Sequence, residues 1–252
     1  MPKGIELFRE KFAGHTDKYV LIGGTACELA MQEADLEFRA TKDLDIVLTV
    51  ETLDPVFSAL FWEFVQAGGY EHQQAGPEGK TQCYRFVKPK EGNYPFMLEL
   101  FSRRSELMQA PADRPITRIH ADGDASSLSA ILMNDAYYAL VQAGRRVTDG
   151  LSTLGAETII ALKAKAFLDL SDRKRRGEKV DSSAIKKHKL DIFRLSVLLM
   201  DTTRVPLTDS IQRDFRAFVQ AMAKEDVITR DLGIRNRTRD QILTTLSTIY
   251  QL

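Results

Sequence analysis

The sequence has few residues of the kinds that stabilise small secreted domains or bind zinc. It contains two cysteines, Cys27 and Cys83, and four histidines among 252 residues. Two cysteines cannot form a disulfide framework, and with scattered histidines they match no zinc-ligand spacing. The composition therefore argues against a disulfide scaffold and against a structural zinc site. The histidines also show no nucleophile–base arrangement, so we expect structural or surface roles for His15, His72, His120 and His188.

Long hydrophobic runs are also missing. No apolar stretch approaches the roughly 18 residues that a membrane span needs, and residues 1–5 lack the apolar segment of a secretory signal. Hydrophobic residues make up 44% of the chain and charged residues 28%, close to the composition of soluble globular proteins. We therefore expect a folded cytoplasmic protein with no membrane partner.

The chain has no excess of either charge. Its 35 basic and 35 acidic residues give a formal charge of zero, so the molecule as a whole does not attract nucleic acid. The local distribution is uneven, because residues 28–71 hold ten acidic and two basic side chains, whereas residues 173–189 hold eight basic and two acidic ones. The basic segment indicates either an anionic partner or a solvated helix end.

The hydrophobic pattern predicts two parts. Alternating and short apolar runs favour strands at 18–22, 43–50, 82–88 and 95–101, with helices at 25–32 and 55–66. Residues 89–93 suit the loop of a hairpin between the last two strands. Beyond residues 122–124, three- and four-residue spacing favours helices alone, at 127–143, 156–170, 183–200, 209–224 and 238–250. The sequence thus predicts an α+β fold, with a mixed part at 1–124 and a helical part at 125–252.

Three acidic residues form the first candidate site. Asp43 and Asp45 lie two apart on a predicted strand, so their side chains point to the same face, roughly 7 Å apart. Glu99 lies in an apolar strand, where a buried carboxylate costs several kcal/mol unless a partner neutralises it. If the second hairpin strand neighbours the Asp43 strand, all three carboxylates can bind shared divalent cations, and oxygen ligands favour magnesium. The alternative is an exposed strand face that carries two acids.

A Gly-Gly-Thr turn precedes this strand. Gly23, Gly24 and Thr25 stand at the end of one apolar strand and the start of a helix, where backbone N–H groups and a hydroxyl can bind phosphate. The turn lacks the lysine of a P-loop and the third glycine of a dinucleotide fingerprint. These residues therefore do not predict a P-loop ATPase or a dehydrogenase.

The two blocks 23–26 and 39–46 resemble the nucleotidyltransferases of the DNA polymerase β superfamily, specifically the AbiEii-type branch of abortive-infection and MenT-like toxins. That branch carries Gly-Gly-Ser/Thr-Ala followed by Arg-x-Ser/Thr-x-Asp-x-Asp. The resemblance implies a nucleotidyltransferase-type mixed sheet with flanking helices, and a helical part that completes the cleft. It also implies that Asp43, Asp45 and Glu99 hold two magnesium ions. Gly23, Gly24, Thr25 and Arg39 would then lie at the triphosphate or nucleotide.

The helical half carries a second match. At 100° per residue, Lys163 falls within an apolar stripe and Lys165 falls outside it, so Lys163 should point inward. The resemblance implies that Lys163 reaches a nucleotide phosphate and that Asp191 lies in the active cleft. Each has a plainer interpretation. Lys163 could pair with a carboxylate, and Asp191 could pair with Lys187, four residues earlier on the same helix.

The resemblance implies an enzyme that moves NMP from a nucleoside triphosphate to an acceptor hydroxyl. Relatives of this branch include toxins that modify tRNA and that have a cognate antitoxin. Residues 173–189 with Arg235, Arg237 and Arg239 would suit RNA phosphates, although they could equally be solvated surface. Two alternatives stay open: transfer to a small-molecule hydroxyl, and a non-catalytic module that binds a nucleotide or a protein on the same fold.

Overall fold

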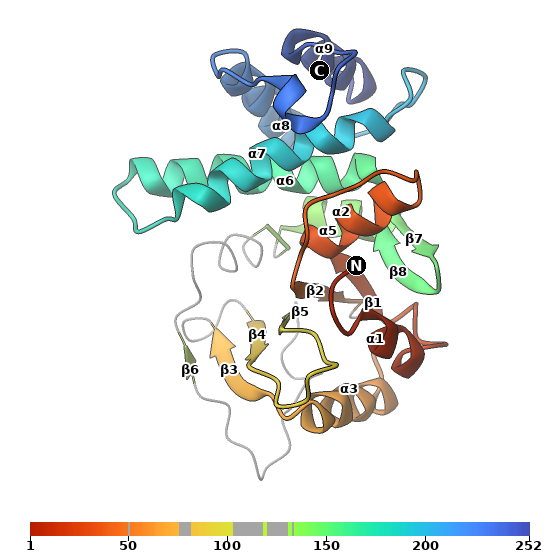
Figure 1. Cartoon of the computed structure of the whole chain (residues 1–252). Coiled ribbons are helices and arrows are strands. Elements are labelled where there is room, and N and C mark those ends of the chain that lie inside the picture. Colours follow the sequence, from red (N-terminus) through yellow and green to blue (C-terminus); the bar gives the residue numbers. More distant parts are fainter. Residues whose placement is uncertain (50, 76–81, 103–117, 120–130, 133) are drawn as a thin grey trace.

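The structure is a computed structural model of the whole chain, and it describes residues 1–49, 51–75, 82–102, 118–119, 131–132 and 134–252. The predicted boundary at residues 124 and 125 lies outside the described residues. Within them, the strands and α3 occupy one end of the molecule, α6 and α7 lie side by side across its middle, and α8 and α9 form the other end (Figure 1). The predicted α+β class, with a mixed sheet followed by a largely helical part, is confirmed.

The main sheet has six strands in the order β1-β2-β5-β4-β3-β6. β2, the second strand in this order, pairs antiparallel with β1 and parallel with β5, and β4 and β5 form the predicted antiparallel hairpin. The strands are β1 (Tyr19–Ile22), β2 (Asp43–Leu48), β3 (Glu71–Ala75), β4 (Gln82–Val87), β5 (Met97–Ser102) and β6 (Arg118–Ile119).

Helices cover both faces of this sheet and build the second half. They are α1 (Ile5–Lys11), α2 (Gly23–Gln32), α3 (Pro55–Ala67), α5 (Asp135–Ala143), α6 (Ala156–Arg175), α7 (Ser182–Leu195), α8 (Asp209–Met222) and α9 (Arg239–Ile249). Short 3-10 turns are η2 (Ser196–Leu198) and η3 (Thr229–Leu232). No helix in the described part of the chain combines the length and hydrophobicity that crossing a membrane requires.

The expectation of helices alone after residue 124 is wrong at one place. A hairpin of β7 (Arg145–Thr148) and β8 (Leu151–Leu154) separates α5 from α6, and β8 is buried beside β1. Asp149 and Gly150 turn the chain with positive φ angles of 51° and 72°. Four-residue strands are too short to show a clear period of two, so the helical pattern around them hides the hairpin. Three further elements, α1, β3 and β6, were not predicted from the sequence.

Alternation along β2 assigns its side chains to two different environments. Leu44, Ile46 and Leu48 face an aromatic cluster beneath α1 and α3, whereas Val47 faces the core shared with α2, α6 and α7. Asp43 and Asp45 have the same parity as Val47, and successive strand residues point to opposite faces. The two carboxylates therefore lie on the side of the sheet that the helical half covers.

The aromatic cluster should account for much of the stability of the strand half. Phe12 is fully buried and packs its ring against Phe8, Phe57 and Phe64, with centroids 4.3, 5.6 and 5.4 Å away. We predict that Phe12→Ala lowers the free energy of unfolding by about 3–5 kcal/mol in chemical denaturation. Phe96→Ala is the matched control, because that ring is 55% exposed. An equal loss in both variants would contradict the assignment.

Candidate active site

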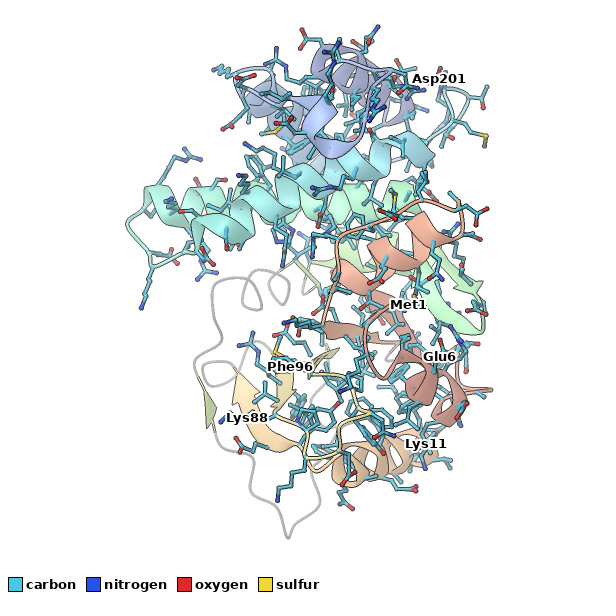
Figure 2. All side chains as sticks on the ribbon, in the orientation of Figure 1. Met1, Glu6, Lys11, Lys88, Phe96 and Asp201 are labelled. Carbon is cyan, nitrogen blue, oxygen red and sulfur yellow. The ribbon has the colours of Figure 1, made fainter. Side chains whose placement is uncertain are left out.

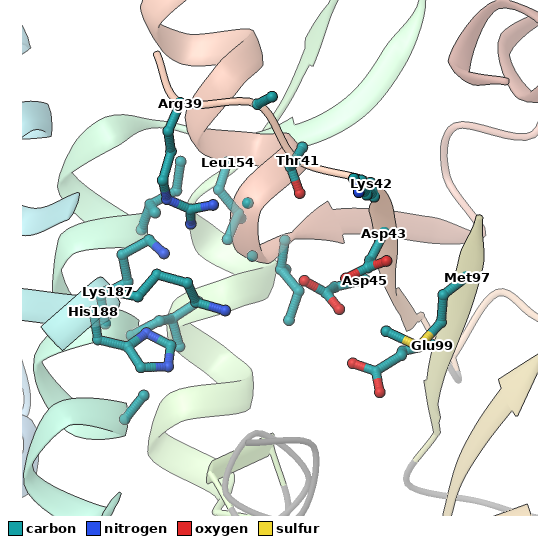
Figure 3. Close-up of a pocket in the computed structure, with 18 of the residues that line it drawn as sticks. Arg39, Thr41, Lys42, Asp43, Asp45, Met97, Glu99, Leu154, Lys187 and His188 are labelled. Atoms are coloured by element: carbon teal, nitrogen blue, oxygen red, sulfur yellow. The ribbon is translucent and has the colours of Figure 1, made fainter. Parts of the chain in front are cut away.

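A cavity of about 440 Å³ lies between the sheet, the start of α2 and helices α6 and α7. Its two walls carry opposite charge, with the predicted carboxylates on the strand side and basic side chains on the helix side (Figure 3). Of the nine residues that the sequence singled out, seven line this cavity: Gly23, Gly24, Arg39, Asp43, Asp45, Glu99 and Lys163. Thr25 and Asp191 lie behind its walls.

The register of β2 against β5 builds the acidic wall. Asp45 stands directly opposite Glu99 and Asp43 opposite Met97. Asp43 and Asp45 are half-buried, whereas Glu99 is only 5% exposed. Burial and the charge of Asp45 raise the pKa of Glu99 well above its ordinary value, and a hydrogen bond to Asp45 acts in the same direction. Burial, followed by the charge of Asp45, also raises the pKa of Asp43. The three acids thus repel one another in a partly desolvated place.

Arg85 is a cavity residue that the sequence analysis missed. It stands opposite Glu99 in the β4–β5 register, and its Nε donates a 2.6 Å hydrogen bond to Glu99 Oε1, with a second contact from Nη2. The side chain of Arg85 is 11% exposed. The predicted hairpin indicated that a residue of the first strand would face Glu99, because side chains opposite each other on paired strands are in contact. Which residue that is depends on the register of the two strands, and the hairpin loop sets that register.

The donor set fits magnesium in part. Among the residues that the structure describes, no three His, Cys, Asp or Glu side chains are grouped so as to hold a metal ion. Glu99 is engaged by Arg85, so the expected set of three carboxylates is not formed. Asp43 and Asp45 still present hard oxygen atoms to the cavity, and protein-bound magnesium commonly uses one or two carboxylates plus water and substrate phosphates. This pair therefore fits a divalent cation that arrives with a phosphate ligand.

Two glycines allow α2 to begin beside the carboxylates. Gly23 has φ +65°, and a Cβ at this position would lie 1.7 Å from Asp45 Oδ2. A Cβ on Gly24 would lie 2.6 Å from Thr41 Oγ1. Ile22, the residue before α2, offers no side-chain cap, and the carboxylate of Asp45 lies beside the first turn of the helix at the edge of the cavity. Such a helix start favours an anion.

Thr25 takes a different position from the one the resemblance implied. It is fully buried, and its Oγ1 donates a 2.8 Å hydrogen bond to the backbone oxygen of Asp43. The hydroxyl is therefore used to join α2 to β2 and does not line the cavity. Thr25 positions the strand that carries the two aspartates.

Asp191 binds the basic wall from behind. It is fully buried and accepts hydrogen bonds from Arg39 Nε at 2.9 Å and Arg39 Nη2 at 2.7 Å. Lys163 Nζ adds a 2.9 Å bond to Oδ2. Burial acts to raise the pKa of Asp191, but Lys163 and Arg39 outweigh it and lower the pKa to about 2. The plainer interpretation of Lys163, a pair with a carboxylate, is thus what the structure shows. Asp191 is also an ion-paired acid, but its partners are Arg39 and Lys163, whereas its plainer interpretation named Lys187.

The choice of Lys163 over Lys165 as the inward lysine is confirmed. Lys163 is 4% exposed and lines the cavity, whereas the side chain of Lys165 is 30% exposed and pairs with Asp214. Lys187 also lines the cavity, where its charge opposes the rise in the pKa of Asp43.

His188 was not expected at the site. It is 4% exposed and lines the cavity beside Lys187 (Figure 3). No sequence signal marked it, because a single histidine on an amphipathic helix is common on a core-facing side. The side chains of His72 and His120 lie outside the described residues.

Comparisons with known proteins find distant structural likeness only. No protein-family model matches the chain, and no curated protein matches it. Three solved structures resemble it at low identity. JHP933 from Helicobacter pylori has 14% identity and a TM-score of 0.34, covering 98% of this chain and 89% of that one. The Cid1 poly(U) polymerase has 11% identity and a TM-score of 0.31, covering 88% and 67%. MenT4, a nucleotidyltransferase toxin from Mycobacterium tuberculosis H37Rv, has 14% identity and a TM-score of 0.28, covering 98% and 91%.

The buried position of Lys163 leads to a stability prediction. Lys163→Met removes one of the cations that compensate the buried Asp191, so we expect a loss of about 3 kcal/mol in the free energy of unfolding. Lys165→Met, two residues away on α6, breaks a more exposed pair and should cost less than about 1 kcal/mol. Urea denaturation of both variants checks this difference, and similar losses would show that the pair with Asp191 has no special weight.

The lowered pKa of Asp191 predicts a dependence on pH. The pKa falls from 3.8 to about 2 on folding, so its contribution is complete above pH 4 and is lost as the pH falls through about 2. Wild-type protein should therefore lose up to about 2 kcal/mol through this group as the pH falls from 4 to 2. Urea unfolding at several pH values should show a shallower acid dependence for Asp191→Asn. Parallel curves would contradict the prediction.

Proposed function

We propose that this protein is a divalent-metal-dependent nucleotidyltransferase that moves NMP from a nucleoside triphosphate to an acceptor hydroxyl. One observation carries the proposal: a single cavity places Asp43 and Asp45 on one wall and Arg39, Lys163 and Lys187 on the other. A metal-bound triphosphate carries cationic and anionic parts side by side, and this charge pattern complements both.

The basic wall and the start of α2 would bind the triphosphate. Lys163 has three N–H donors and Arg39 has five, so both keep donors for phosphate oxygens while they contact Asp191. The start of α2, where Gly23 and Gly24 line the cavity, would add the positive end of a helix dipole. Asp191 would act as a positioning residue, because it holds both cations at the wall.

The reaction would join the acceptor oxygen to the α-phosphorus and break the bond to the β-phosphate, releasing pyrophosphate. Asp43 and Asp45 would hold the metal, which when bound supplies charge neutralisation and a lower pKa for the attacking hydroxyl. Arg39 and Lys163 would stabilise the charge that develops on the leaving pyrophosphate.

The structure weakens one argument for an RNA acceptor. Basic residues at the end of α6 and directly after it pair with nearby acids, Arg173 with Glu178 and Arg176 with Asp172 and Glu178. Arg239 is paired with Asp240. These side chains are therefore partly neutralised before any phosphate arrives. We leave the acceptor class, tRNA or a small hydroxylated molecule, and an antitoxin partner to experiment.

A non-catalytic binding module is the second candidate. One observation favours it: Glu99 is bound by Arg85 and Asp191 by Arg39 and Lys163, so the polar groups already satisfy one another. A domain that binds nucleotide without turnover would show the same internal pairing. Nucleotide consumption separates the two candidates.

The catalytic proposal predicts that Asp45→Asn abolishes turnover. Removing one carboxylate from the metal-facing pair should lower nucleotide consumption at least 100-fold, on the scale of about 3 kcal/mol in the barrier. The assay incubates each of four labelled triphosphates with magnesium and total cellular RNA or small hydroxylated acceptors.

Asp201→Asn, at the end of the molecule away from the sheet (Figure 2), is the control and should remain active. Consumption that Asp45→Asn leaves unchanged would refute the catalytic role of Asp45, and label on one acceptor class identifies the substrate.

A further inference from the structure

The ion pair of Arg85 with Glu99 places a fixed cation inside the acidic wall. Arg85 comes from β4 and Glu99 from β5, and strand register brings them face to face. Both side chains are nearly buried, with 11% and 7% exposure. On the other side of Glu99, Asp45 of β2 occupies the paired position. Glu99 therefore lies between an acid and a guanidinium.

This arrangement affects any divalent cation that approaches the wall. Asp43, Asp45 and Glu99 together attract cations, but the guanidinium already compensates Glu99 at hydrogen-bond distance. A divalent ion placed between Asp45 and Glu99 would lie close to the positive charge of Arg85 in a region of low dielectric constant, where like charges repel strongly. Arginine stays protonated at every accessible pH, so a proton cannot be released to remove this repulsion.

We propose that Arg85 is a positioning residue that competes with divalent metal for Glu99 and so lowers the affinity of the acidic wall for free cations. The inference rests on the proposed function, because it takes Asp43 and Asp45 as metal ligands. Without nucleotide, the guanidinium of Arg85 holds Glu99 from the β4 side, opposite Asp45. Cation binding is then weak until a triphosphate supplies further oxygen ligands, which couples metal binding to nucleotide binding.

The test measures Mn²⁺ affinity without nucleotide, from the electron paramagnetic resonance signal of free Mn²⁺. Arg85→Gln should lower the Mn²⁺ dissociation constant at least tenfold, because Glu99 becomes available and the repulsive charge is lost. Lys88→Gln is the matched control, since Lys88 lies just beyond β4, is 70% exposed and pairs with Glu71 (Figure 2). It should leave the dissociation constant within twofold of wild type. An Arg85→Gln affinity equal to or weaker than wild type overturns the proposal.

A double-substitution cycle shows whether Arg85 acts through Glu99. In a Glu99→Gln background the target of the guanidinium is gone and only its charge still acts on the ion, so adding Arg85→Gln should tighten Mn²⁺ binding by clearly less than the tenfold gain expected in the wild-type background. A full tenfold gain in that background contradicts competition for Glu99. The double variant with Arg85→Gln and Glu99→Gln also leaves no uncompensated charge buried between the strands.

If Arg85→Gln alone does not fold, Arg85→Lys is measured in its place. Lysine keeps the positive charge but lacks the planar guanidinium that binds Glu99 at two points, so Mn²⁺ binding should tighten at least threefold. An unchanged affinity in Arg85→Lys then overturns the proposal.

A further variant separates failure of this inference from failure of the proposed function. Asp45→Asn should weaken Mn²⁺ binding in both the wild-type and the Arg85→Gln backgrounds. If Asp45→Asn has no effect in either background, the acidic wall does not bind metal and the proposed function fails with the inference. If it weakens binding while Arg85→Gln has no effect, only the inference fails.

Discussion

The buried carboxylate of Asp191 is the interaction on which the basic side of the cavity depends. Desolvating an ionised carboxylate costs several kcal/mol unless charged partners surround it. Arg39 supplies a two-point contact from the segment before β2, and Lys163 supplies a third hydrogen bond from α6. Asp191 itself lies on α7. One acid therefore joins three segments distant in sequence and holds two cations at the cavity wall.

The acidic side depends on a different constraint, the alternation of side chains along paired strands. Asp43, Asp45 and Glu99 face the helices because their neighbours, such as Leu44 and Leu98, fill the aromatic cluster on the opposite face. A shift of one residue in register would bury the acids among aromatic rings. Burying the large apolar side chains thus determines where the charged ones point.

Internal pairing has a cost for any ligand of this cavity. Glu99 is bound by Arg85, and Lys163 and Arg39 are bound by Asp191, so a ligand must add to these contacts or replace them. Exchanging one hydrogen bond for another gains little free energy, because a typical bond contributes only about 0.5–1.5 kcal/mol net in the first place. Affinity should therefore come from contacts that add to these internal pairs and from the charge separation between the walls.

The sequence by itself determined the strand that carries Asp43 and Asp45, the hairpin that carries Glu99, and the inward direction of Lys163. These follow from local periodicity, which the chain expresses over a few residues. The tertiary structure alone decided that Asp191 binds Arg39 and Lys163, that Thr25 supports β2, and that Arg85 and His188 enter the cavity. Partners such as Arg39 and Asp191 lie 152 residues apart. Which distant charges meet is decided by how sheet and helices pack to bury their apolar faces, and no local pattern records that choice.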